Sequence, residues 1–138
     1  MGQQQLLLIV LGVILVGVAV VLGIQYFGVG AEEGAKDELV AHSLTIGANA
    51  QQWYKKPVAM GGGGGDFTAN GGFTAYFTTN LTRLHETSNS QVPPNGYGVV
   101  VTDANTVTIT ALPKIGQGFV FTSVVTTVTP YDMTTVIN

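Results

Sequence analysis

The chain has 138 residues, which is enough for one domain in addition to any N-terminal helix. Only 9% of its residues are charged and the formal net charge is −3, so the basic surface typical of nucleic-acid binding is excluded. It contains no Cys, which excludes both a disulfide framework and a thiolate metal site.

Residues 6–24, LLLIVLGVILVGVAVVLGI, form an apolar run without a charged or strongly polar side chain. As a helix this run is about 28 Å long, close to the roughly 30 Å of a membrane core. A removed secretion signal is one alternative, because Val29-Gly30-Ala31 resembles a cleavage site, but no Lys or Arg precedes the run. A buried helix of a soluble domain is another, although such helices rarely carry so long a run. We predict a membrane or filament-core helix over residues 1–30.

Residues 31–56 have the pattern of an amphipathic helix. Small, apolar or aromatic residues and one His recur there at a spacing near 3.5, namely Ala35, Leu39, His42, Ile46, Ala50 and Trp53. Acidic residues gather in the first turns, Lys55 and Lys56 stand at the end, and Pro57 blocks continuation. The sequence therefore predicts one long helix whose first part is apolar and whose second part is amphipathic.

Residues 57–96 are rich in Gly and separate the helix from the strands that follow. The uninterrupted run 61–65 is predicted to be a flexible connection. It does not fit a phosphate-binding loop, because Lys followed by Ser or Thr is absent and Asp66 would repel an anion. Residues 73–84 mix aromatic residues with Thr and fit either a short helix or an edge strand.

Residues 97–138 have the alternation of β-strands. Strands are predicted over 97–102 and 106–112, joined at 103–105 as a hairpin, and then over 119–129 and 133–137, with turns at 113–118 and 130–132. The predicted fold class is α+β: a long N-terminal helix packed on a small antiparallel sheet, with a Thr-rich face outward.

Residues 1–56 also carry a resemblance to a known family. The uncharged apolar N-terminus continues into GIQYFGVGAEEGAKDELVAHSLTIGANAQQWY, which resembles the helix of a type IV pilin or a related filament subunit. The resemblance implies that apolar helices of identical subunits bundle into a filament core outside the cell, with the heads on its surface. It further implies an inner-membrane pool before assembly and a pilus assembly machinery as partner.

Two departures from the pilin pattern concern particular positions in the helix. Where pilins typically have a glutamate near the start of the chain, the nearest residue is Gln5, whose amide can accept a hydrogen bond from a neighbouring amine without charge pairing. Where pilins often have a helix-breaking proline, this chain has Gly23, Gly28 and Gly30, which weaken a helix by roughly 1 kcal/mol each. The resemblance thus assigns subunit register to Gln5 and helix melting to the three glycines.

Small residues within the apolar run favour association with other helices. Gly12, Gly17, Ala19 and Gly23 are predicted to form grooves where neighbouring backbones approach closely. The alternative explanation is that Gly is simply commoner in membrane helices than in soluble ones.

No catalytic, metal or cofactor residue is predicted, and an enzyme is not expected. His42 is predicted to be a packed or interface residue rather than a ligand, and His85 is the other histidine. Asn80-Leu81-Thr82 is a candidate glycosylation motif. The expected function is that of a structural subunit of a type IV pilus-like filament. The alternatives are a pseudopilin-like component of a secretion or uptake machine, and a single-pass membrane protein whose β domain binds a partner.

Overall fold

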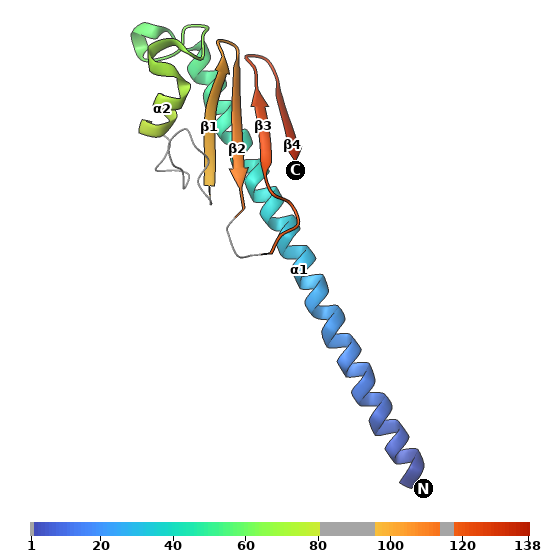
Figure 1. Ribbon diagram of the computed structural model, residues 1–138. Helices are drawn as coiled ribbons and strands as arrows, with labels where there is room; N and C mark the ends of the chain where they lie inside the picture. The colour runs from blue at the N-terminus through green and yellow to red at the C-terminus, as the bar shows by residue number, and fades with distance from the viewer. Residues whose placement is uncertain (1, 81–95, 114–117) are drawn as a thin grey trace. The chain divides into compact units, whose positions relative to one another are not determined.

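The computed structural model describes residues 2–80, 96–113 and 118–138 (Figure 1). Two compact units, Met1–Gly34 and Ala35–Asn138, are described separately below. The elements in chain order are α1 (Gly2–Lys55), η1 (Val58–Met60), η2 (Ala69–Gly71), α2 (Gly72–Asn80), β1 (Gly96–Asp103), β2 (Thr106–Leu112), β3 (Val124–Val128) and β4 (Met133–Ile137). A long N-terminal helix packed on a four-stranded antiparallel sheet confirms the predicted α+β class.

Helix α1 is continuous over 54 residues and ends one residue before the predicted boundary. Pro57, which cannot continue a helix interior, follows two residues later. Within the second unit, one face of α1 is buried, and its buried residues recur every three or four positions: Ser43, Ile46, Gly47, Ala50 and Trp53. The predicted amphipathic helix is therefore confirmed, with this face packed into the core.

The glycine run 61–65, predicted from the sequence as a flexible connection, closes the end of α1 through backbone hydrogen bonds. The last carbonyl groups of a helix lack partners inside the helix. Here the backbone N–H of Gly63 donates to the Trp53 carbonyl and that of Gly65 donates to the Tyr54 carbonyl, both at 2.8 Å. A Cβ atom on Gly63 would lie 2.6 Å from the Trp53 ring, so only glycine fits this close turn. Glycine composition alone does not reveal such packing.

Aromatic side chains fill the end of the core next to this turn. The Trp53 ring lies 5.7 Å from that of Phe73 and 6.1 Å from that of Tyr76, and its Nε1–H donates to the Gly61 carbonyl at 3.0 Å. Phe73 and Tyr76 belong to α2, so residues 72–80 form the short helix, one of the two alternatives left open by the sequence. Residues 81–95 lie outside the described part of the chain.

The sheet is a simple meander in the order β1-β2-β3-β4, with every neighbouring pair antiparallel. The predicted hairpin is confirmed, although β1 extends to Asp103 and the turn contains Ala104 and Asn105 alone. A register shift between Val101 and Asp103 accommodates the difference. The predicted strand 119–129 is wrong in extent, since β3 covers only Val124–Val128; residues 114–117 of the turn before it are outside the described chain.

Alternate residues of the strands point into the core or away from it. The inward row Val99, Ile109, Thr126 and Thr135 packs toward α1, and the Thr126 and Thr135 hydroxyl groups hydrogen-bond at 3.0 Å. The next row consists of Val100, Thr108, Thr127 and Thr134, which are exposed or half-buried. The predicted Thr-rich outer face is thus confirmed.

Candidate assembly surface

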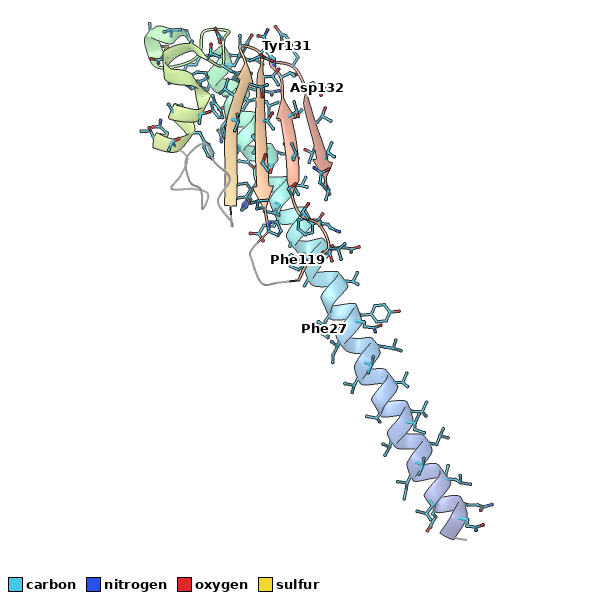
Figure 2. The ribbon with its side chains drawn as sticks, viewed as in Figure 1. Phe27, Phe119, Tyr131 and Asp132 are labelled. Carbon is cyan, nitrogen blue, oxygen red and sulfur yellow. The ribbon has the colours of Figure 1, made fainter. Side chains whose placement is uncertain are left out.

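The unit Met1–Gly34 consists of the apolar part of α1. Its large apolar side chains are exposed all along the segment, and Phe27 near its end is 84% exposed (Figure 2). Among the described helices, α1 alone is long and apolar enough to cross a membrane, and none of its most apolar window is buried. A secretion signal satisfies the same criteria of length and composition. Exposed apolar surface of this extent requires lipid or protein to cover it.

The continuous helix sorts the small residues of this segment into two rows. At about 100° per residue, Gly12, Ala19 and Gly23 lie within about 40° of one another, whereas Gly17 lies roughly 140° away from Gly12. Gly30 and Gly34 lie on the same side as Gly12, and Gly28 lies on the same side as Gly17. We call the first set row one: Gly12, Ala19, Gly23, Gly30 and Gly34. Row two consists of Gly17 and Gly28. The predicted packing residues are thus on two different sides of the helix.

An 11-residue spacing is the sequence signal for these rows. It relates Gly12 to Gly23 and Gly34, relates Ala19 to Gly30, and relates Gly17 to Gly28. Because 11 residues make just over three turns, residues at this spacing stay on one side of a helix. The packing residues predicted above, Gly12, Gly17, Ala19 and Gly23, do not include Gly28, Gly30 and Gly34, which this spacing adds to the two rows.

No described residue explains why these positions hold glycine. A Cβ atom added at Gly12, Gly17, Gly23, Gly28 or Gly30 would meet no described atom within 4 Å outside the local helix backbone. This contrasts with Gly47 in the second unit, where an added Cβ would lie 2.7 Å from the sulfur of Met133. The space beside rows one and two is therefore available to a neighbouring helix.

The residues assigned from the pilin resemblance lie in the same segment. Gln5 is exposed in the first turns of α1. Gly23, Gly28 and Gly30 are all helical, so the helix is not broken at any of them. Their role in helix melting and the role of Gln5 in subunit register stay predictions.

The remaining candidate residues belong to the second unit. Asn80 is exposed at the end of α2, where its side-chain amide donates to the Tyr76 carbonyl at 3.0 Å, and the rest of its glycosylation motif lies outside the described residues. His42 is half-buried, and His85 is likewise outside the description. No group of three or more His, Asp or Glu side chains within residues 2–80, 96–113 and 118–138 could hold a metal ion.

His42 and Tyr97 connect α1 to the sheet. His42 Nδ1 lies 2.9 Å from the Tyr97 hydroxyl, and the two rings are 5.7 Å apart. Burial, assisted by the negative charge of Glu38, raises the pKa of Tyr97 from its ordinary 10.0 to about 12. The predicted packing of His42 is confirmed by this contact.

The raised pKa of Tyr97 makes the stability of the head depend on alkaline pH. The folded state keeps the phenol protonated where the unfolded chain loses the proton, so stability is fully present below pH 10.0 and falls as the pH rises toward about 12. We expect Tyr97→Phe to remove most of this decline. Urea unfolding of the two proteins across this pH range, followed by circular dichroism, measures it; equal declines would show that Tyr97 is not responsible.

Comparison with known proteins finds no matching family model, no matching curated protein and no matching solved structure.

Proposed function

We propose that this protein is a structural subunit that polymerises into an extracellular, type IV pilus-like filament. The observation that carries the proposal is a continuous 54-residue helix with two kinds of surface. Its N-terminal part exposes apolar side chains in every direction, and its C-terminal part buries one face under an antiparallel sheet. The N-terminal part of this helix is thus compatible with a membrane, and its C-terminal part belongs to a folded head.

Rows one and two favour assembly over a lone membrane anchor. A single helix in lipid has no need for small residues along two of its sides, whereas packed helices need them for close backbone approach. Two separate rows allow each helix to contact neighbours on two sides at once. Such two-sided contact is required for a polymer, since a helix with one contact side forms only a closed pair.

The outer surface of the proposed filament comes from the second unit. Its sheet presents Thr-rich rows outward, and few of its described residues are charged. Identical subunits are the principal partner in this proposal, with the membrane holding the chain before assembly. No enzymatic step is assigned to any residue.

Electron microscopy of material sheared from the cell surface tests the proposal, with mass spectrometry to identify the subunit and its N-terminus. We expect thin filaments that consist of this chain. Recovery only in short complexes within the cell envelope would support the pseudopilin-like alternative. Recovery only as dispersed membrane protein would support the membrane-anchored β domain, and either result would overturn the filament proposal.

A further inference from the structure

Strand β4 forms an open edge of the sheet. It pairs with β3 along one side, from Val124 opposite Ile137 to Val128 opposite Met133. No described residue pairs with its other side in the order β1-β2-β3-β4. Unpaired backbone groups along a strand edge are a ready template for another strand.

The pairing pattern identifies the backbone groups on that open side. Thr129 N–H donates to the Asp132 carbonyl and Asn138 N–H donates to the Ser123 carbonyl, both at 2.9 Å. Hydrogen-bonded and non-hydrogen-bonded pairs alternate along an antiparallel ladder. The N–H and C=O groups of every second residue, at Met133, Thr135 and Ile137, therefore face outward.

The first of these outward N–H groups, that of Met133, is already paired within the chain, by the side chain of Asp132. Its carboxylate accepts the Met133 N–H at 2.8 Å, beside the turn that Figure 2 marks with Tyr131 and Asp132. The carboxylate thus stops strand addition at this end of β4. The N–H groups of Thr135 and Ile137 have no acceptor among the described residues.

The opposite edge of the sheet is not open in the same way. The hydroxyl group of Thr74 in α2 donates to the Val99 carbonyl of β1 at 3.3 Å, so α2 occupies the middle of that edge (Figure 1). A second head that placed its β4 on β1 would have to displace this contact. Within the described part of each head, the open edge of β4 is therefore its segment from Thr135 to Ile137, beyond the Met133 N–H that Asp132 occupies.

We propose that β4 pairs with the β4 strand of a second copy of this chain, antiparallel and around a two-fold axis at Thr135. The sequence MTTVIN is free of charge and of Pro, so two copies meet without like-charge repulsion or loss of a donor. In this register the outward N–H and C=O groups of Thr135 hydrogen-bond with those of Thr135 in the other copy. Thr134 then lies directly opposite Val136 of the other copy.

This pairing has a different symmetry from a filament. A two-fold contact closes on itself, so it joins two heads and does not propagate. One short strand pair is also a small interface, and we expect weak association between isolated chains. The inference does not depend on assembly through α1, because it concerns only the sheet.

Cysteine pairing tests the proposed register in a chain that has no Cys of its own. Full-length Thr134→Cys and Val136→Cys proteins, of different tag mass, are purified in detergent, mixed and oxidised. Residues opposite each other in a non-hydrogen-bonded pair are about 4.5 Å apart between Cα atoms, within disulfide reach. The same position in the two copies, 134 with 134 or 136 with 136, lies diagonally across the pair at about 7–8 Å, at or beyond disulfide reach. We expect the disulfide-linked dimer of Thr134→Cys with Val136→Cys to form in clear excess over the amount that random pairing of the two chains would give. Intact mass measures the mixed dimer and the two homodimers separately.

A second variant tests whether backbone pairing holds the contact. Ile137→Pro removes an outward N–H but no bond to β3, so we expect it to lower the yield of mixed dimer when both chains carry it. Circular dichroism checks that the sheet is retained. Statistical dimers would show random collision within micelles and overturn the proposal, as would the absence of dimers or a yield unchanged by Ile137→Pro. None of these outcomes bears on whether filaments form.

Discussion

Gly23→Leu is expected to abolish filaments while the protein accumulates in the membrane with its head folded. Gly23 lies in row one, next to Ala19 on the same side of α1, and a Cβ there meets no described atom within 4 Å outside the local helix backbone. Leucine would therefore fill the space that a neighbouring helix occupies and would not strain the monomer. Counting filaments by electron microscopy, against protein recovered from membranes, measures the effect.

Val18→Leu is the matched control for this substitution. Val18 is exposed in the same apolar segment, belongs to neither row, and gains one methylene on replacement. Filaments are expected to form as in the unaltered protein. Normal filaments with Gly23→Leu would remove row one from the assembly surface and would favour the interpretation of these glycines as ordinary membrane-helix residues.

Trp53→Ala is expected to unfold most of the head. The side chain is 2% exposed, and its loss removes the ring contacts to Phe73 and Tyr76 together with the hydrogen bond to Gly61. Replacing a buried Trp with Ala typically costs about 3–5 kcal/mol, compared with a total of about 5–15 kcal/mol for a domain. Most or all of the stability of a marginal head is lost.

Hydrogen exchange detected by mass spectrometry measures the loss, because the variant lacks the only Trp and its fluorescence. Peptides from β2 and β3 are expected to lose protection, while α1 of residues 6–24 stays protected in detergent. Tyr131→Ala is the control: Tyr131 is 92% exposed, and a change within about 0.5 kcal/mol is expected. Retained protection of β2 and β3 in Trp53→Ala would contradict the central role of this side chain.

The elements with strong periodicity were predictable from the sequence. The apolar run and the 3.5-residue spacing gave α1 to within one residue of Lys55, and alternation gave β2 and β4 with their observed bounds. The strand 119–129 was too long because apolar residues before Val124 pack without ladder pairing: the rings of Phe119 and Phe121 stack 5.7 Å apart. Hydrophobic alternation does not distinguish apolar residues in a paired strand from apolar residues that pack outside a strand.

Other features required tertiary contacts. Glycine-rich composition indicates flexibility, and only the carbonyl groups of Trp53 and Tyr54 show that residues 61–65 close a helix. The candidate assembly surface was predictable in its residues but not in its arrangement. A helix break at Gly23 would have reset the angular positions of everything after it, so the two rows depend on the continuity of α1.

The meander order of the sheet has a consequence for how the head folds. Each strand pairs with its neighbour in the chain, and two of the three connections are short turns, so the ladders close with little loss of chain entropy. Docking of the sheet on α1 joins residues much farther apart, such as His42 and Tyr97. Contacts of long sequence separation slow folding, so we expect docking, rather than strand pairing, to set the rate at which a newly made head matures.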